Sequence, residues 1–586
     1  MKIILAKTAG FCMGVRRAVE LALDAPSQYP QPIYTFGPLI HNPQVLALFA
    51  EKGVTVLEEI PEHGNGTVLV RAHGVPPSAR RRLKEAGFKV INATCPRVIK
   101  VQSIIKSHAR KGYAVIIVGD EDHPEVVGLL GYAGDRKYVV NSLESLRELP
   151  EFEHAIIVAQ TTQNLREYGQ MSAWAAQERP HYKIFDTICD STEKRQAEVR
   201  RIASNVDAVV VVGGKNSGNT QRLAAIVKAV GKPAFHVETE SELDMEALAQ
   251  VRRLGITAGA STPSWIIKRV LRTLEQIPIK RGRGWRAFWL KLQRYLLLTN
   301  IYVALGAGCL AYAITRLQGL PAFYPSVAVA VLYVMSMHIL NHLTGRAENK
   351  YNDPDRAQFY ARFKVPLIVM AVLAGAFGLL SAYFMGPFPF WGLVFMSFLG
   401  LTYNLRIVPC RLTPKPGFRS LRSFPGSKTI LIALAWGVVT AALPALAARH
   451  NGILTGVVAF VWATGLVFCR TAFFDILDVQ GDRIVGKETI PILIGPKRAF
   501  KLLKGVLVAE IIVLPVSAAC GVIHPVAYAL VLPPLLLLVL VSSHERGNML
   551  PGMRMEFRVE SLFVLSGVLA LILTLLSGIW AGSGLA

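Results

Sequence analysis

A change in hydropathy near residue 295 divides this chain of 586 residues into two parts. Beyond it, apolar segments of about 20 residues recur, each long enough to cross a hydrocarbon layer of about 30 Å. Before residue 280, short apolar runs alternate with polar and charged stretches, as in a soluble α/β protein. Because the length exceeds that of one ordinary domain, we expect a soluble domain over 1–278, a linker over 279–294 and a transmembrane domain over 295–586.

Nine apolar segments follow the linker and predict an all-α domain of nine transmembrane helices. They span residues 295–315, 322–341, 365–385, 387–405, 428–448, 452–474, 505–523, 525–541 and 559–581. Lys and Arg are concentrated in four connecting loops, 342–364, 406–427, 475–504 and 542–558, which marks these loops as cytoplasmic. We therefore expect a multi-pass inner (plasma) membrane protein whose soluble domain is cytoplasmic and whose C-terminus lies outside.

The linker and the net charge of +24 both fit a membrane protein. The linker IPIKRGRGWRAFWLKL is basic and contains Trp285, Phe288 and Trp289, which suits a segment lying at the lipid interface. No compact basic motif with interleaved aromatic residues occurs, so we expect no nucleic-acid partner. The start of the chain, MKIILAKTAG, predicts a first strand rather than the apolar core of a signal peptide.

Polar clusters follow the predicted strands of the soluble domain at the points where those strands end. The strands are Ile3–Ala6, Ile33–Phe36, Val68–Val70, Val90–Ile91, Val115–Val118, Ile156–Val158, a strand at Phe185, Val209–Val212 and Ile256–Thr257. Their alternation with helical patterns predicts open, mostly parallel sheets, arranged as several similar lobes around one site. In such sheets, ligands bind beyond the carboxyl ends of the strands.

Three cysteines of the soluble domain, Cys12, Cys95 and Cys189, each lie in one of these loops. Their wide separation does not match a zinc-finger spacing, and a reducing compartment disfavours structural disulfides. Three thiolates could hold a 4Fe–4S cluster and leave one iron without a protein ligand, which is the open position that substrate coordination requires. Three buried thiols without a cofactor are the alternative.

Three histidines and several neutral donors occupy equivalent loops. His41, His73 and His123 lie beside Pro or Gly and not on an apolar helical face, which favours a shared site over three separate structural roles. The donors at strand-to-helix turns are Ser217, Asn219, Thr220 and Ser261. Helix N-termini attract phosphate, and the same residue types also serve as ordinary N-caps, so both roles remain open.

The motifs GFCMGVRRA, GPLIHNP, RAHG, ATCP, HPEVVG, QTT, DTIC and NSGN occur in this order. Over residues 1–278 they resemble the 4-hydroxy-3-methylbut-2-enyl diphosphate reductase family. The resemblance implies a three-lobed α/β fold around a 4Fe–4S cluster held by Cys12, Cys95 and Cys189. It also implies a proton source, Glu125, and a diphosphate site whose members are His41, His73, His123, Ser217, Asn219 and Ser261, with Thr161 nearby.

The implied reaction removes the hydroxyl group of an allylic diphosphate substrate and yields isopentenyl and dimethylallyl diphosphates, the last step of the methylerythritol phosphate route to isoprenoids. It needs two electrons from a ferredoxin- or flavodoxin-like donor. Iron would act as a Lewis acid while Glu125 supplies protons. The chain departs from the family pattern at Gly218, where a second serine is usual; we expect this to weaken phosphate binding by about 1 kcal/mol without abolishing activity.

An acidic motif follows the sixth apolar segment. Asp475, Asp478 and Asp482 are spaced i, i+3 and i+7, which places them on one face of a helix. Three carboxylates on one face repel each other unless a cation joins them, and Mg²⁺ favours carboxylates together with substrate phosphates. A solvated helix end is the alternative.

This motif and the nine-helix layout resemble the UbiA superfamily of intramembrane prenyltransferases, over roughly residues 295–581. The resemblance implies that Mg²⁺, held by two aspartate motifs, ionises a prenyl diphosphate whose prenyl group passes to an acceptor. The first motif departs: after Asn341 the chain has Gly345 and Asn349, and its aspartates, Asp353 and Asp355, come later. Further phosphate ligands would be Lys415 and Arg419, and Tyr403 and Asn404 would close the fourth helix.

Two alternatives remain open. The membrane domain could be a non-catalytic anchor or prenyl-lipid binder rather than a second enzyme. The soluble domain could be an iron–sulfur reductase for a different diphosphate. Covalent fusion raises the local concentration of a shared product only if that product travels between the two sites.

Overall fold

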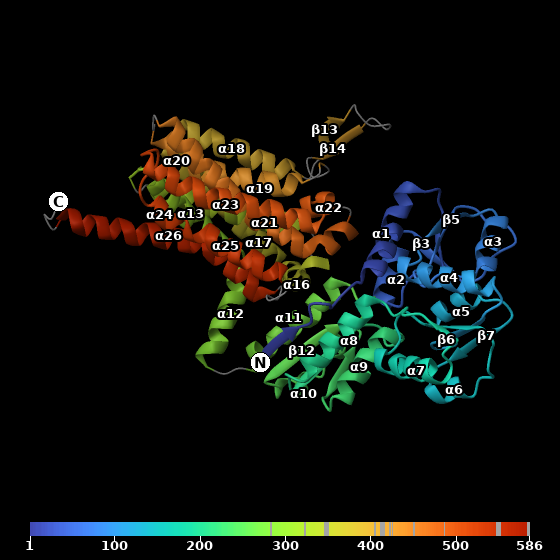
Figure 1. The fold of residues 1–586 in the computed structure, drawn as a ribbon. Coiled ribbons are helices and arrows are strands. Elements are labelled where there is room, and N and C mark those ends of the chain that lie inside the picture. The colour runs from blue at the N-terminus through green and yellow to red at the C-terminus, as the bar shows by residue number, and fades with distance from the viewer. Residues whose placement is uncertain are drawn as a thin grey trace. The chain divides into compact units, whose positions relative to one another are not determined.

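The computed structural model describes the chain except for residues 282–283, 322–323, 345–350, 404–405, 411–416, 421–423, 425, 449–451, 486, 547–551 and 583–586. The chain folds into two compact units, Met1–Pro278 and Ile279–Ala586. The first unit contains both strands and helices, and the second is built almost entirely of helices (Figure 1).

Three four-stranded parallel sheets form the frame of the first unit, with the strand orders β1-β12-β10-β11, β3-β2-β4-β5 and β7-β6-β8-β9. The strands are β1 (Lys2–Leu5), β2 (Ile33–Phe36), β3 (Val54–Leu57), β4 (Thr67–Val70), β5 (Lys89–Asn92), β6 (Ala114–Val118), β7 (Lys137–Val140), β8 (Ala155–Ala159), β9 (Lys183–Ile184), β10 (Ala208–Val212), β11 (Ala234–Val237) and β12 (Arg253–Ala258). The prediction of a three-lobed α/β fold with parallel sheets is confirmed.

Helices cover both faces of these sheets. They are α1 (Met13–Gln28), α2 (Pro43–Glu51), α3 (Pro77–Glu85), α4 (Pro96–Ala109), α5 (Pro124–Leu130), α6 (Leu143–Arg147), α7 (Leu165–Glu178), α8 (Asp190–Ala203), α9 (Gly218–Ala229), α10 (Met245–Ala249) and α11 (Ser264–Arg281). In β6, Ile116 belongs to the apolar cluster that includes Met171 of α7, whereas Val115 belongs to the cluster that includes Ile105 of α4. Burying each such side chain contributes about 1.5–3 kcal/mol, which explains why the inner strands are continuous apolar runs.

The outer strands β3, β7 and β11 were not predicted from the sequence. Each contains part-exposed residues, and none ends in a cluster of candidate ligands. The strand expected at Phe185 ends one residue earlier, at Ile184, although the Phe185 amide still donates to the Ile157 carbonyl at 3.0 Å.

The second unit consists of long apolar helices and one small hairpin. The helices are α12 (Trp285–Leu298), α13 (Ile301–Leu317), α14 (Tyr324–Thr344), α16 (Pro354–Arg362), α17 (Lys364–Met385), α18 (Pro387–Thr402), α19 (Ser427–Gly437), a π-helical turn (Val438–Ala442), α20 (Leu443–Ala447), α21 (Ile453–Ile484), α22 (Ile490–Ile494), α23 (Pro496–Ala519), α24 (Ala527–Leu530), α25 (Leu532–Glu545) and α26 (Met553–Gly582). The hairpin pairs β13 (Arg406–Cys410) with β14 (Gly417–Ser420).

The expected count of nine spans is not confirmed. Among the described residues, seven helices are long and apolar enough to cross a membrane, or eight if the bent pair α12–α13 is one span. That pair is bent by 76°, and Asn300 at the break has the left-handed backbone conformation, with φ 59°. Helix α18 has only 16 residues and falls short of a full crossing. The side of the membrane on which the chain ends therefore does not follow from the count.

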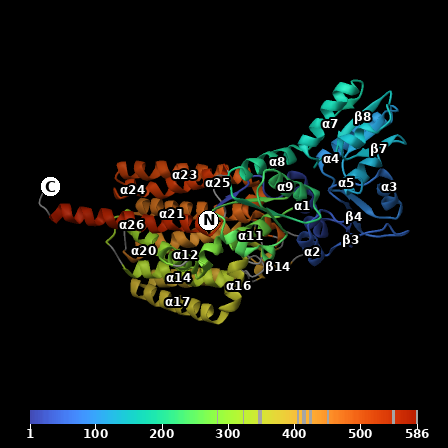
Figure 2. The ribbon, with the colours of Figure 1, turned by 90° about the horizontal axis from the view of Figure 1, so that it is seen from below.

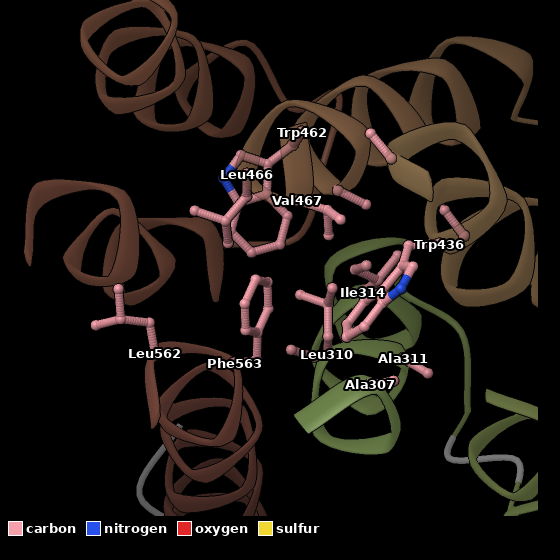
Figure 3. Packing of buried hydrophobic residues seen from close by; sticks show 14 of the residues in the cluster. Ala307, Leu310, Ala311, Ile314, Trp436, Trp462, Leu466, Val467, Leu562 and Phe563 are labelled. Carbon is pink, nitrogen blue, oxygen red and sulfur yellow. The ribbon is translucent and has the colours of Figure 1, made fainter. Parts of the chain in front are cut away.

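The interior of the second unit is a continuous apolar core. Trp436 of α19, Trp462 and Leu466 of α21 and Phe563 of α26 belong to one buried cluster, which also includes Leu310 and Ile314 of α13 (Figure 3). Helices α14 and α17 lie side by side (Figure 2). On α17, the outward residues include Val372 and Phe377, which are 59% and 55% exposed. Such exposed apolar surface is normal where lipid replaces water as the solvent.

Part of one expected loop and part of the linker are helical instead. Helix α21 has 32 residues, about 48 Å at 1.5 Å per residue, and continues to Ile484, so residues 475–484 are helical and not part of a loop. The second half of the linker is helix α12, on which Trp285 and Phe288 are 71% and 54% exposed. Four residues of the sequence interpretation lie outside the described residues: Gly345, Asn349, Asn404 and Lys415. The side chain of Arg419 is likewise not described.

Candidate functional site

Each sheet delivers one cysteine from an edge strand. The loops after β1, β5 and β9 lead to Cys12, Cys95 and Cys189, and each cysteine is the N-cap of the helix that follows, α1, α4 or α8. The cysteine amides donate to the carbonyls of Ala260, Ala72 and Thr161 at 3.1, 2.9 and 2.9 Å, so each loop is tied to a neighbouring strand end of its own sheet. Three equivalent edge strands thus present three equivalent thiols.

The three thiols lie within electrostatic reach of one another. Burial raises the pKa of Cys95, and the negative charges of Cys12 and Cys189 raise it further. Hydrogen bonds from the backbone N–H groups of Arg97 and Val98 lower the same pKa in part. Among the described residues, the three sulfur atoms are not a group whose members all lie within 4.8 Å of one another. Since Zn–S bonds of about 2.3 Å limit the sulfurs around one ion to about 4.6 Å apart, this spacing does not suit one zinc ion and leaves room for a multi-iron cluster.

Gly14 and Arg195 adjust the surroundings of the thiols. A Cβ atom at Gly14 would overlap the sulfur of Cys95, so only glycine leaves room there. Arg195 is buried and donates to the carbonyls of Ala258 and Gly10 at 2.7 and 3.0 Å. Burial lowers its pKa to about 10, while the nearby charges of Cys12 and Cys189 act in the opposite direction. This cation, which sequence reasoning missed, favours the thiolate forms and an anionic cofactor.

The central strands of the sheets deliver the histidines. His41 follows β2, His73 follows β4 and His123 follows β6, and one ring nitrogen of each lies within 4.8 Å of the others. The ring centroids are 4.7, 5.5 and 5.8 Å apart. Nε2 of His41 and Nδ1 of His73 are buried and have no partner among the described residues. The structure thus brings together the three histidines that the sequence singled out.

The charge around the histidines favours an anion over a metal ion. Three nitrogens at this spacing could hold one metal ion. However, the pKa of each histidine is lowered, mainly by burial. The nearby positive charge of Arg71 lowers the pKa of all three further. The pKa of His123 falls to about 4. Neutral imidazoles beside a guanidinium group, with unpaired nitrogens, are suited to donate hydrogen bonds to phosphate oxygens.

Binding of inorganic diphosphate should raise the pKa of His41, His73 and His123, because a nearby anion stabilises the charged imidazolium form. The measurement is an NMR titration of the full chain labelled at histidine, with and without diphosphate. His154 and His181 lie outside this group and serve as internal references. Unchanged titration of all three in the presence of bound diphosphate would contradict the assignment.

Glu125 follows His123 by two residues, in the first turn of α5, and is linked to Cys189 through Thr161. Its buried carboxylate accepts hydrogen bonds from the Thr161 amide at 2.7 Å and the Thr161 hydroxyl at 2.9 Å, and the Thr161 carbonyl accepts from the Cys189 amide. Burial raises the pKa of Glu125, while Thr161 and Arg222 lower it in part. The Glu125 amide donates to Nδ1 of His123 at 3.1 Å, which leaves the proton of a neutral His123 on Nε2.

The neutral donors come from the central strands of the first sheet. Ser217 and Asn219 follow β10 and Ser261 follows β12, and all three are buried. The Ser261 hydroxyl donates to the His41 carbonyl at 3.2 Å, which ties this sheet to the histidine loop. Nδ2 of Asn219 is buried without a partner among the described residues, and so is Oγ1 of Thr220. Unpaired buried donors indicate a polar ligand.

Two arginines that the sequence interpretation did not select also reach this region. Arg222 of α9 donates to Asp120 at 2.7 Å and to Thr162 at 3.3 Å, which connects the first sheet with the loops after β6 and β8. Arg71 donates to the Gly74 carbonyl at 3.2 Å. Gly218 begins α9, and a Cβ there would approach Arg222 to 3.3 Å. The signal for both arginines was their place within or next to the motifs RAHG and NSGN.

The aspartates of the second unit have polar partners of their own. Asp475 is 3% exposed, accepts a hydrogen bond from the Thr429 hydroxyl and lies 3.8 Å from Nζ of Lys428. Asp482 is 1% exposed and accepts from the Asn352 amide at 2.8 Å. Among the described residues, the three carboxylates of the motif are not a group within 4.8 Å. One Mg²⁺, with ligands at about 2.1 Å, therefore cannot contact all three in this arrangement.

Comparison with known proteins divides the chain at the same place. Residues 3–275 match the LytB protein family model, and residues 300–549 match the UbiA prenyltransferase family model. The 4-hydroxy-3-methylbut-2-enyl diphosphate reductase of Pelobacter propionicus is 41% identical over 277 residues, which are 47% of this chain and 99% of that relative. The corresponding reductase of Aquifex aeolicus is 42% identical over 282 residues, 47% of this chain and 96% of the relative.

Solved structures match the same part of the chain. The structure of (E)-4-hydroxy-3-methyl-but-2-enyl diphosphate reductase is 41% identical, covers 47% of this chain and 100% of that chain, and has a TM-score of 0.38. Because relatives of about 41% identity are covered almost completely, the chain belongs through residues 3–275 to the LytB family of 4-hydroxy-3-methylbut-2-enyl diphosphate reductases, and residues 300–549 match the UbiA prenyltransferase family model.

Proposed function

We propose that Met1–Pro278 catalyses the reductive dehydroxylation of 4-hydroxy-3-methylbut-2-enyl diphosphate. Two electrons and two protons cleave the carbon–oxygen bond, the hydroxyl group leaves as water, and the allylic carbon skeleton takes up one proton to give isopentenyl or dimethylallyl diphosphate. The electrons come from a ferredoxin- or flavodoxin-like donor. The observation that carries the proposal is the pattern of the three sheets, in which edge strands supply the thiols and central strands supply the anion-binding side chains.

The donor set fits an iron–sulfur cofactor. Cys12, Cys95 and Cys189 would hold a 4Fe–4S cluster, which when bound supplies electrons and a Lewis-acidic iron without a protein ligand. Arg195 balances part of the negative charge of the thiolates. Because burial raises the pKa of Cys95, cofactor binding must release the proton that this thiol carries at neutral pH.

The remaining residues bind and protonate the substrate. His41, His73 and His123 donate to the diphosphate together with Ser217, Asn219 and Ser261. The histidines are half-buried and the three neutral donors are buried, which limits competition from water. Burial raises the pKa of Glu125, which favours its protonated form, and Thr161 keeps its carboxyl group in one orientation. Glu125 is therefore the proton source for the leaving hydroxyl group.

The test of the reductase proposal is anaerobic purification of the full chain, followed by iron and sulfide analysis and electron paramagnetic resonance. Addition of the hydroxylated diphosphate should change the resonance spectrum and yield the two C5 diphosphates under strong reductant. Protein with an intact cluster that leaves this substrate unconsumed would rule the proposal out, and a screen of other allylic diphosphates would then identify the substrate.

We infer that the second unit transfers a prenyl group within the plasma membrane, with the reductase on the cytoplasmic side. Asp475, Asp478 and Asp482 would supply carboxylate ligands to Mg²⁺, without one ion contacting all three, and bound Mg²⁺ would help a prenyl diphosphate to ionise. The prenyl group bonds to an acceptor, and diphosphate and a proton leave. The match to the UbiA family and the burial of two of these aspartates support this function. Intramembrane carboxylates are costly and are usually functional. A non-catalytic anchor or prenyl-lipid binder is the second candidate, favoured by the altered first aspartate motif.

If the second unit is an enzyme, replacing Asp478 by asparagine should lower the rate of prenyl transfer by more than about tenfold, because a metal ligand is lost. Asp478 is the suitable target since it is less buried than Asp475 and Asp482, whose loss would also strand Thr429 and Asn352. The measurement is transfer of a radiolabelled prenyl group in membranes. The matched control is Glu545→Gln, which removes a carboxylate that pairs with Lys504. Unchanged transfer in Asp478→Asn would favour the anchor.

A further inference from the structure

A single arginine of helix α9 reaches the loops of another sheet. The Arg222 side chain runs back along α9 toward the start of the helix, as side chains on helices generally do, so that a Cβ atom at Gly218 would lie 3.3 Å from its Nη1. Nη2 donates to Oδ2 of Asp120 at 2.7 Å, and Nη1 donates to Oγ1 of Thr162 at 3.3 Å. Asp120 follows β6 and Thr162 follows β8, both in the sheet β7-β6-β8-β9. The guanidinium group therefore joins the start of α9 to two loops of a different lobe.

The two acceptors are held in place by a buried glutamine. The Asp120 amide donates to Oε1 of Gln160 at 3.1 Å, and Nε2 of Gln160 donates to Oγ1 of Thr162 at 3.0 Å. Gln160 is 0% exposed. Together with the two hydrogen bonds of Arg222, these contacts form a closed ring. A guanidinium group suits this position, because its planar fork presents N–H donors in a fixed geometry to two acceptors at once.

Each acceptor adjoins a residue of the proposed substrate site. The Asp120 carbonyl accepts a hydrogen bond from the His123 amide at 3.0 Å. Thr162 follows Thr161, whose amide and hydroxyl donate to the Glu125 carboxylate at 2.7 and 2.9 Å. The two hydrogen bonds of the guanidinium group therefore fix both the turn that carries His123 and the segment that orients Glu125.

The same guanidinium group adjoins the donors on its own helix. Ser217 is the N-cap of α9, and Asn219 lies in the first turn. On the other side of the contact, burial lowers the pKa of His123 and raises that of Glu125, and the charge of Arg222 acts on both pKa values in the lowering direction. Displacing this group would therefore alter the surroundings of site residues from two lobes at once.

The contact is too exposed to serve stability alone. The Asp120 side chain is 51% exposed, and that of Arg222 is 16% exposed. An ion pair with one partner this exposed contributes little to the free energy of unfolding, because water competes for the charges. By contrast, misplacing binding groups by about 1 Å can lower a reaction rate by about 100-fold. Loss of Arg222 should therefore affect substrate binding more than stability.

We propose that Arg222 is a positioning residue of the reductase, whose guanidinium group holds the loops after β6 and β8 against the start of α9, so that donors from two sheets face one diphosphate group. Arg222 acts through these loops and does not itself need to contact the substrate. The inference rests on the proposed reductase function and adds to it a residue that the donor set does not include.

The test compares steady-state kinetics of the full chain, with its cluster intact, for the wild type and Arg222→Met. We expect the KM for the hydroxylated diphosphate and the inhibition constant of inorganic diphosphate to rise by about tenfold, whereas kcat falls less, because the lost contact acts on binding. Iron content and the midpoint of thermal unfolding should stay near their wild-type values. Inhibition of the reductase reports on the first unit alone, whether or not the second unit also binds diphosphate.

Two further variants separate positioning from charge. Arg222→Lys keeps the charge but lacks the planar fork that reaches two acceptors, so it should recover only part of the affinity for diphosphate. Asp120→Ala should raise the KM less than Arg222→Met does, because the contact with Thr162 remains. In the Arg222→Met background, Asp120→Ala should add little, since Asp120 acts through Arg222.

The matched control is Arg179→Met, which removes an arginine that pairs with Glu151 at 3.5 Å within one lobe; it should keep the wild-type KM and inhibition constant. Unchanged constants in Arg222→Met, full recovery in Arg222→Lys, or additive effects of Arg222→Met and Asp120→Ala would overturn the inference. A large fall in iron content or in the unfolding midpoint of Arg222→Met would also overturn it, by showing a structural residue. A wild-type chain that holds its cluster and leaves the hydroxylated diphosphate unconsumed would instead overturn the reductase proposal, so the two failures are distinguishable.

Discussion

Replacing Cys95 by serine should remove most of the iron from the protein and lower reductase activity by more than about 100-fold, since losing even a group that only orients a metal ligand costs about 10–100-fold. Cys95 is the most informative of the three thiols. Burial raises the pKa of Cys95, and the charges of both Cys12 and Cys189 raise it further, so Cys95 interacts electrostatically with both other thiols. The measurements are iron and sulfide per chain and the electron paramagnetic resonance spectrum after anaerobic reconstitution.

The matched control is Cys520→Ser, which removes an exposed thiol of the second unit. It should keep the wild-type iron content and activity. A Cys95→Ser protein with a full complement of iron and an unchanged spectrum would show that these thiols do not share a cofactor, and the reductase proposal would lose its basis.

Replacing Glu125 by glutamine should lower the turnover number of the reductase by about 10²–10⁴-fold, the usual contribution of a positioned proton donor. Glutamine preserves the shape of the network. Its carbonyl oxygen still accepts from the Thr161 amide, and its amide group can donate to the Thr161 hydroxyl, so only the transferable proton is lost. The iron content and the affinity for the substrate should stay near their wild-type values, and steady-state kinetics with a titrated reductant measure the loss.

Stability provides a second readout for the same variant. Burial raises the folded-state pKa of Glu125 above its ordinary value of 4.5, so above that pH the folded protein holds a proton that the unfolded chain releases. Folding stability is then lost as the pH rises from 4.5 toward the folded-state pKa. Glu125→Gln removes this loss and should be at least as stable as the wild type at pH 7 in thermal unfolding. A strongly destabilised variant would instead indicate a mainly structural carboxylate.

The inner strands of the reductase were predictable because strands buried on both faces consist of continuous apolar residues. Strands such as β6 and β10 are fully buried, and their carboxyl ends lead directly to His123 and Ser217. The outer strands β3, β7 and β11 carry no such signal, since they are partly exposed and lead to no candidate ligand. The sequence also did not predict that edge strands lead to the cysteines and central strands to the histidines, because the order of strands in a sheet is known only from the folded structure.

The arginines of the site were missed for a different reason. Arg195 lies on a helix among charged residues that resemble a solvated face, yet it is buried and donates to two strand-end carbonyls. In the second unit, the nine crossings expected from the length of apolar segments are not confirmed among the described residues. The break at Asn300 depends on a single backbone conformation, which hydropathy does not report. The ion pairs of Asp353 and Asp355 depend on partners distant in sequence or on a local turn.

The delivery of one thiol by each of the three sheets has a consequence for how the reductase responds to oxygen. A cofactor held in this way acts as a cross-link between three lobes, each of which has its own sheet and, in large part, its own buried core. Its destruction would remove this cross-link and leave the lobes joined by fewer contacts, such as those of Ser261 with His41 and of Arg222 with Asp120. Damage would then expose the connections between lobes first, and a protease could remove the inactive enzyme from those connections while intact copies remain protected.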